Sequence, residues 1–224
     1  MVVHPAAGHY SHTLVNAVLY HCRGQLSGIN GVLRPGIVHR IDKDTTGSVI
    51  VCKNDAAHQA LAVQFADHTI TRRYRAIVHG VLTDDEGIID APIGRDNADR
   101  KKMAVNQVNG KRAVTHYTVL KRFERFTYIE CRLETGRTHQ IRVHMASLGH
   151  PLLGDSLYHL SDTTNLFSRA ALHAWKLKFQ PPFPNGETTS SPLSSMPCTE
   201  NAKKEISLEA PLPEDFKKFY ETIF

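Results

Sequence analysis

Apolar residues recur along this chain with two different spacings, which divide it into short helices and strands. Helical spacing predicts four helices, which start after Ser11 or Thr13, after Asn54 or Asp55, after Thr138, and at Asp215. The oxygens of these side chains suit the N-cap position, because they accept N–H groups that the first helical turn leaves free. The second helix is expected to run to about Asp67 and the fourth to Ile223. The third helix is expected to present Ile141, Met145 and Leu148 on one face and to end at Gly149.

Alternating or β-branched runs predict the strands, over 37–41, 49–51, 70–81, 113–120, 127–133, 175–179 and 206–208. Strands outnumber helices, and the segment FERF at 123–126 suggests a hairpin turn between two of them. This pattern favours an α+β fold around a mixed, mainly antiparallel sheet over a doubly wound parallel one. Residues 24–36 are predicted as a loop, and residues 180–204, rich in Pro, Ser and Thr, as a mobile loop.

Composition and charge describe an ordinary soluble protein with a basic excess. The 224 residues carry a formal net charge of +5, and six Lys or Arg stand against two Asp between residues 95 and 112. A basic stretch permits a polyanionic partner without proving one. The four cysteines, Cys22, Cys52, Cys131 and Cys198, form no CxxC, and no apolar run approaches membrane-spanning length. We therefore expect a cytoplasmic protein that is not bound to a membrane.

Two segments carry the candidate chemistry, GIVHRIDKDTTG at 36–47 and LETGRTHQIRVH at 133–144. The first places Asp42 in a turn between apolar runs, and the second places Arg137 in a turn before a helix. A carboxylate held ionised by a fixed guanidinium would serve as a nucleophile or base. The alternative for Asp42 is a local Asx-turn, and the alternative for Arg137 is an ordinary arginine that contacts phosphate from outside.

Both segments closely resemble the signatures of the RluA-type pseudouridine synthases, which isomerise uridine to pseudouridine in RNA. The resemblance is nearly continuous over residues 1–160, and includes KMAVNQVNGKRAVTHY and LETGRTHQIRVHMASLGHPLLGD. The stretch RPGIVHRIDKDTTG is most similar to the branch that modifies large-subunit ribosomal RNA. The resemblance implies an antiparallel sheet with a central cleft, flanked by helices and loops, and no cofactor.

The resemblance also implies roles for single residues. Asp42 matches the family's catalytic aspartate, and Arg137 matches the arginine expected to pair with it. Tyr74 matches a tyrosine that packs against the target base, although a tyrosine in an alternating strand is more often simple core packing. Arg40 matches an arginine that enters the RNA stack when the base flips out.

Further basic residues are candidates for binding the RNA backbone. Two of them, Arg72 and Arg73, flank Tyr74, and six lie in a segment expected to be a loop or hairpin at the cleft edge: Arg95, Arg100, Lys101, Lys102, Lys111 and Arg112. Lysine and arginine there would neutralise phosphates, and such contacts depend little on the base sequence of the RNA. The alternative is a solvated charged loop.

A metal site is not expected. DKDTTG half-matches a calcium loop, but the twelfth position is Lys53, where a glutamate is required. Of the fourteen histidines, His139 and His144 stand five residues apart, which suits one helical face poorly, and neither lies in an HExxH motif. Hydrogen-bonded, buried histidines are the better interpretation of these two and of His39 and His116.

The sequence thus predicts one catalytic domain over 1–224, lacking the family's first strand and any N-terminal RNA-binding domain. The expected function is pseudouridine formation by a monomer, with large-subunit ribosomal RNA as the partner. Transfer RNA as substrate, or a catalytically silent RNA-binding or ribosome-assembly protein, are the alternatives. A glycosidase would need paired carboxylates across a sugar-sized cleft, for which Asp44 and Glu134 are the local candidates.

Overall fold

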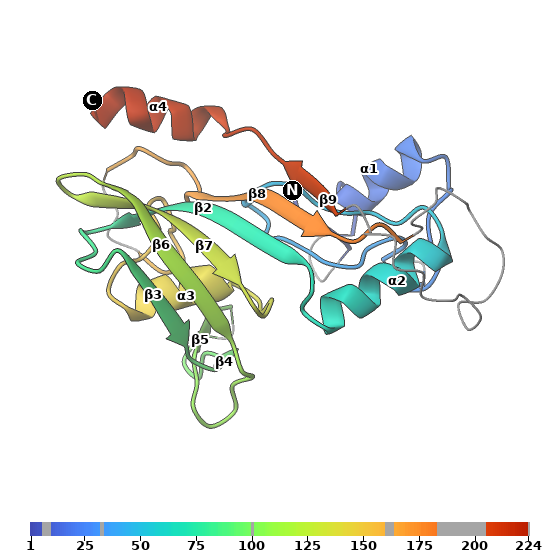
Figure 1. Ribbon diagram of the computed structural model, residues 1–224, viewed down its shortest axis with the longest axis horizontal. Coiled ribbons are helices and arrows are strands. Elements are labelled where there is room, and N and C mark those ends of the chain that lie inside the picture. The colour runs from blue at the N-terminus through green and yellow to red at the C-terminus, as the bar shows by residue number, and fades with distance from the viewer. Residues whose placement is uncertain (6–9, 32–33, 100, 160–163, 183–204, 224) are drawn as a thin grey trace.

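A seven-stranded sheet forms the frame of the computed structural model, which describes residues 1–5, 10–31, 34–99, 101–159, 164–182 and 205–223. The strands lie in the order β1-β8-β2-β7-β6-β3, and β9 also pairs with β8 (Figure 1). Their bounds are β1 Thr46–Gly47, β2 Thr71–His79, β3 Glu86–Asp90, β6 Val114–Arg122, β7 Phe126–Leu133, β8 Leu172–Phe179 and β9 Ile206–Glu209. Among the strand pairs within the described residues, only β1–β8 is parallel, so the predicted α+β fold with a mainly antiparallel sheet is confirmed.

Helices cover both faces of the sheet because its central strand is apolar on both sides. Ala76 and Val78 of β2 pack in one core cluster with Met145 of α3 (Gln140–Ser147). Ile77, which points to the other face, belongs to a second cluster with Phe216 of α4 (Glu214–Ile223). Figure 1 shows α3 and α4 on opposite sides of the sheet. A strand buried on both faces is a fixed platform from which side chains can be aimed.

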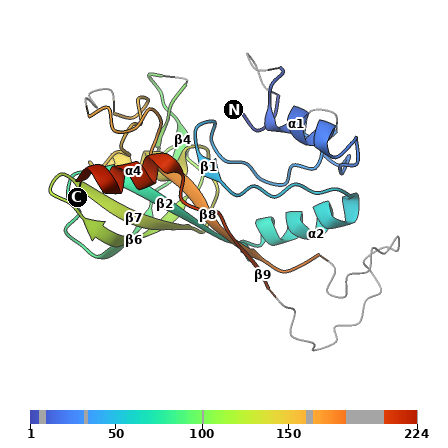
Figure 2. The same cartoon turned by 90° about the horizontal axis from the view of Figure 1, so that it is seen from above.

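The two N-terminal helices lie beyond the β1–β8 side of the sheet (Figures 1 and 2). In α1 (Leu14–His21) the Thr13 side chain accepts the N–H of Asn16 in a capping box, and α2 (Asp55–Ala66) is capped by Asn54, as predicted. Leu61 of α2 packs with Leu177 and Phe179 of β8. The segment between the helices is thereby held against the sheet.

Two short strands were predicted at 37–41 and 49–51, and this prediction is wrong. The structure gives these segments only an isolated bridge between Ile37 and Val51. The N–H of Ile50 is taken by the ring of His39, whose Nε2 lies 2.8 Å away, and not by a backbone carbonyl. The alternating apolar residues of these segments therefore belong to a packed loop that leads to β1.

The start of α3 also differs from the prediction. Its N-cap residue is His139, with φ of 55° and no side-chain cap, and not Thr138. The Gln140 side chain accepts the N–H of Arg137 at 2.9 Å, which satisfies a donor ahead of the helix. Ile141 and Met145 are buried as predicted, but Leu148 follows the last helical residue and is 44% exposed.

The basic segment over 94–112 was predicted to be a loop or a hairpin, and the structure shows a hairpin. Its strands are β4 (Ile93–Arg95) and β5 (Met103–Val105), which pair with each other and stand apart from the main sheet. The edge strand β3 was not predicted. The late strands and the terminal helix are confirmed as β8, β9 and α4, whereas residues 183–204 of the predicted mobile loop lie outside the described residues.

We expect Phe216→Ala to destabilise the fold by about 3–5 kcal/mol, because its fully buried ring contributes to the contact of α4 with the sheet. Denaturant unfolding would measure the loss. The matched control is Tyr20→Ala on α1, where the ring is 90% exposed and the change should stay within about 0.5 kcal/mol. Equal effects of the two substitutions would contradict this view of the core.

Candidate active site

A cavity of about 300 Å³ opens where the loop before β1 meets β2, the end of α2 and the start of α3. Five of the residues singled out in the sequence line it: Arg40, Asp42, Arg72, Tyr74 and Arg137. They come from segments almost a hundred residues apart, so only the folded sheet brings them together. We call this cavity the cleft.

Asp42 is placed by a loop that is fastened to the sheet directly after it. Gly47 has φ of 115°, and a Cβ there would lie 2.2 Å from the carbonyl oxygen of Ala174, so only glycine permits this approach to β8. The hydroxyl of Thr46 hydrogen-bonds to Nδ1 of His173 at 2.8 Å. Arg169 donates to the carbonyl of Asp44 at 3.2 Å, which steadies the turn itself.

The ion pair that the structure gives to Asp42 is with Arg142 and not with Arg137. Nη1 of Arg142 lies 3.7 Å from Oδ2 of Asp42. The same guanidinium donates through Nε and Nη2 to the two carboxylate oxygens of Asp155, at 2.7 and 2.8 Å. Asp155 is 1% exposed, so Arg142 is held in a fixed, bidentate orientation.

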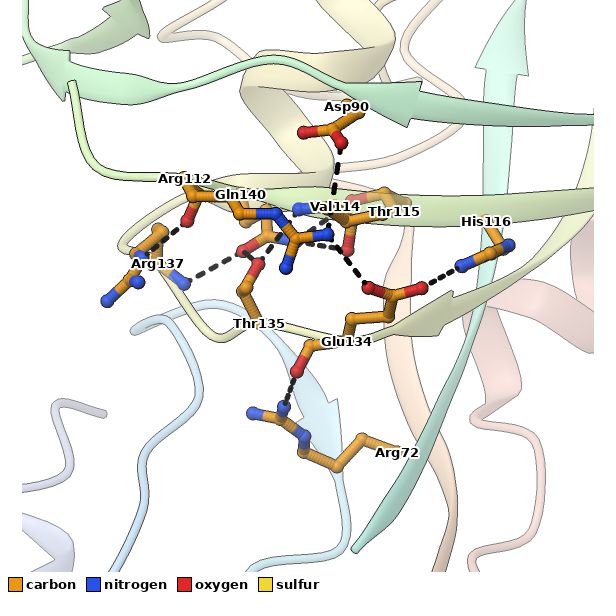
Figure 3. Close-up of polar contacts among 10 residues, drawn as sticks. All are labelled: Arg72, Asp90, Arg112, Val114, Thr115, His116, Glu134, Thr135, Arg137 and Gln140. Carbon is orange, nitrogen blue, oxygen red and sulfur yellow. Dashed lines mark hydrogen bonds and ion pairs between the residues drawn. The ribbon is translucent and has the colours of Figure 1, made fainter. Parts of the chain in front are cut away.

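Arg137 lines the same cleft in a different way. Its Nε donates to the carbonyl of Arg112 at 3.0 Å, and its side chain is exposed (Figure 3). Arg142 was not among the residues predicted from the sequence, although it lies in the same segment, LETGRTHQIRVH. The signal that could have found it is a basic residue inside an otherwise buried helical turn, followed by the acidic Asp155.

Tyr74 forms one wall of the cleft from the central strand β2. It is 8% exposed, and burial raises its pKa to about 12, while Arg72 lowers and Asp42 raises that value. The hydroxyl therefore stays protonated at neutral pH. Because both charged groups act on it, Tyr74 lies within electrostatic reach of Asp42 and of Arg72, which line the same cleft.

Arg142 itself is packed against an aromatic side chain. The guanidinium of Arg142 lies over the ring of Tyr158, 5.0 Å from its centroid. The hydroxyl of Tyr158 accepts the N–H of Met103 and hydrogen-bonds to Nδ1 of His139 at 2.9 Å. The β4–β5 hairpin is thus tied to the helix that carries Arg142.

The remaining basic residues fall into separate places. Arg73 points away from the cleft and pairs with Glu130 at 2.5 Å, so we leave it out of the site. Arg112 pairs with Glu134 at 3.4 Å and lies 3.8 Å from Asp90 (Figure 3). The others belong to the β4–β5 hairpin and its flanks, namely Arg95, Lys101, Lys102 and Lys111, while Arg100 lies outside the described residues.

The four histidines singled out in the sequence, His39, His116, His139 and His144, are hydrogen-bonded as expected, but of these only His144 is fully buried and the other three are partly exposed. His116 contacts Glu134 at 2.7 Å, and His144 contacts the Thr115 hydroxyl and the carbonyl of Ala91, both at 2.9 Å. In the described ranges, no three His, Cys, Asp or Glu side chains gather in a way that could hold a metal ion. Likewise, none of the helices described there has the length and apolar character to cross a membrane.

This arrangement is accompanied by a clear match to known proteins. The family model for RNA pseudouridylate synthase matches residues 1–147, well over half of the chain. The chain belongs to the RNA pseudouridylate synthase family. The expected family and enzyme class, an isomerase acting on RNA, are thereby confirmed.

Two relatives of this synthase align along its whole length. An uncharacterised RNA pseudouridine synthase of Bacillus subtilis is 51% identical over 223 residues, which cover 100% of this chain and 67% of that protein. A ribosomal large subunit pseudouridine synthase D of Zymomonas mobilis is 50% identical over 231 residues, with the same coverage of each chain. The synthase described here therefore spans about two thirds of the length of these relatives.

A solved structure shows the same fold. Human RNA pseudouridylate synthase domain containing 1 superposes with a TM-score of 0.67 at 24% sequence identity, over 90% of this chain and 74% of that one. The sheet with a cleft described above is therefore the fold of this family.

Acid should weaken the loop that carries Asp42, through His39. Burial, and then the charge of Arg72, lower the pKa of His39 from 6.5 to about 4. Below pH 6.5 the unfolded chain takes up a proton that the folded chain accepts only near pH 4. The free energy of unfolding should thus fall by up to about 3 kcal/mol between these pH values.

The control is His39→Gln, which retains an acceptor for the N–H of Ile50 but does not titrate. Urea unfolding at pH 7 and pH 4.5 should show a smaller loss for this variant than for wild type. Identical losses would mean that His39 does not carry the effect.

Proposed function

We propose that this synthase isomerises uridine to pseudouridine in large-subunit ribosomal RNA, with Asp42 as the catalytic carboxylate. The observation that carries the proposal is the Asp42 side chain in the cleft, 3.7 Å from a guanidinium that Asp155 holds in place. The ribosomal RNA substrate is supported by the name of the Zymomonas mobilis relative, which is 50% identical. In this proposal Arg142 takes the role that the sequence assigned to Arg137.

The reaction breaks the bond between C1′ of the ribose and N1 of uracil and forms a bond from C1′ to C5. The proton on C5 leaves, and N1 gains one, so no redox group is required. The Asp42 carboxylate acts as nucleophile or base in this exchange, and Arg142 orients it through their ion pair. Tyr74 offers an apolar ring against which the uracil can pack while it turns, a contact worth about 1–3 kcal/mol for stacked bases.

The RNA must release the target base from its stack to reach this carboxylate, because C1′ and C5 are inaccessible inside a helix. Arg40 is exposed at the mouth of the cleft, two residues before Asp42, and suits the space that the flipped base leaves. The basic side chains of the β4–β5 hairpin and the exposed Arg137 would neutralise flanking phosphates. Binding should accordingly weaken as salt rises.

We expect wild-type protein to release tritium from large-subunit ribosomal RNA labelled at C5 of uridine, and Asp42→Asn to release none above background. Asp44→Asn is the matched control, because Asp44 is an exposed carboxylate in the same turn and should leave release unchanged. Release by Asp42→Asn would remove Asp42 from its proposed role. Release by wild type from transfer RNA alone would contradict the ribosomal substrate.

Substitutions of Arg142 and Arg137 should change different kinetic constants. Arg142→Lys can keep the charge beside Asp155 but cannot span both carboxylates, so we expect kcat to fall about 100-fold with little change in KM. Arg137→Gln should raise KM and leave kcat nearly unchanged, because its side chain is exposed and makes no ion pair with Asp42. The reverse outcome would restore Arg137 as the partner of Asp42. Denaturant unfolding of both variants checks that they are folded.

A further inference from the structure

Arg72 is a buried cation that the fold itself does not neutralise. The residue is 9% exposed and lines the cleft from β2. Its Nη2 donates to the carbonyl of Glu134 at 3.1 Å, and its Nε is buried without a hydrogen-bond partner. Among the residues that the structure describes, no carboxylate pairs with it. A buried charge without a counter-charge is costly, and such groups mark places where a ligand completes the site.

The acidic residue whose backbone contacts Arg72 turns its side chain away from this guanidinium. Figure 3 shows the carboxylate of Glu134 directed toward His116 and Arg112, while only its backbone carbonyl meets Arg72. Asp42, the acidic residue that lines the cleft, is paired with Arg142. Both carboxylates that could have compensated Arg72 are therefore engaged elsewhere.

The other described residues in contact with Arg72 carry no carboxylate. The ring of Phe65 lies 5.8 Å from its guanidinium carbon and stacks on His39. His39 accepts the N–H of Ile50 through Nε2, which requires the neutral ring. Arg40 and Arg137 add two further cations to the walls. The cleft thus offers a surplus of positive charge around one buried donor.

The guanidinium of Arg72 is packed closely against the backbone at Gly136. A Cβ at this position would lie 2.6 Å from Nη1 of Arg72, so a side chain there would push the guanidinium from its place. Gly136 and the carbonyl of Glu134 therefore hold Arg72 in a defined position in the wall of the cleft.

We infer that Arg72 is the receptor for one RNA phosphate, that of a nucleotide next to the extruded uridine. The inference rests on the proposed function and names a contact within it. A phosphate supplies the full negative charge that the buried guanidinium lacks, and arginine's planar fork matches two of its oxygens. Uracil is neutral and would leave the charge uncompensated. Arg72, Tyr74 and Asp42 line the same cleft, so a phosphate on Arg72 would belong to a nucleotide close to the reacting base.

The test measures binding of synthetic ribosomal RNA hairpins to wild type, Arg72→Gln and the control Arg73→Gln. Arg73 is the next residue on β2, but it faces the opposite side of the sheet and is paired with Glu130. We expect Arg72→Gln to weaken the Kd about ten- to a hundredfold and to reduce the salt slope by about one charge, with no change for Arg73→Gln.

A methylphosphonate placed at each linkage around the target uridine removes one charge at a time. One linkage should weaken wild-type binding by the same factor as Arg72→Gln, and should have no further effect on that variant. Equal affinities of the two proteins for every hairpin would overturn the inference. So would a loss that follows removal of a uracil carbonyl and no single phosphate.

Unfolding of the RNA-free proteins distinguishes a structural role of Arg72 from a role in phosphate binding. Because Arg72 is an uncompensated buried charge, Arg72→Gln should be as stable as wild type or more stable. A large loss of stability would identify Arg72 as a structural residue and overturn the inference. A wild type that binds RNA but releases no tritium would contradict the proposed function alone, since the phosphate contact is measured by Kd.

Discussion

One guanidinium, that of Arg142, joins the parts of the molecule on which the cleft depends. It is bidentate to the buried Asp155 in the loop after α3, and its remaining nitrogen faces Asp42 in the loop before β1. Burial lowers the pKa of Arg142, whereas Asp155 and Asp42 raise it. The net effect is a raised pKa, so this guanidinium stays charged. Two parts of the chain that are about a hundred residues apart, the loop of Asp42 and the segment of α3 and Asp155, thereby share one electrostatic centre.

The arginines of this protein divide into two groups by their partners. This division separates arginines of the scaffold from arginines that face the cleft, which exposure alone does not. Arg73 and Arg142 form ion pairs with carboxylates and so belong to the scaffold. Arg40, Arg72 and Arg137 face the cleft, and none of the described residues offers them a carboxylate, although one of the three is almost fully buried. A protein that binds a polyanion must leave some of its positive charge uncompensated until the ligand arrives.

Most of the fold could be predicted from local patterns, because alternation and capping residues mark β2, β6, β7, α1 and α2 directly in the sequence. The misassigned strands at 37–41 and 49–51 had the right residue types, but a histidine ring replaced the partner strand there. The partner of Asp42 could not be deduced from spacing, since Arg137 and Arg142 are both close in sequence. Which of them reaches the carboxylate depends on the left-handed His139, which starts the helix one residue later than expected.

The strand order has a consequence for how the protein is made. The Asp42 loop is fastened through β1 to β8, and β8 lies between β1 and β2. A ribosome synthesises residues 42 and 74 long before residue 172, so the two sides of the cleft have no common scaffold while the chain grows. The cleft is therefore completed only after β8 has been synthesised, because a shorter chain carries both halves of the site without the strand that sets their spacing.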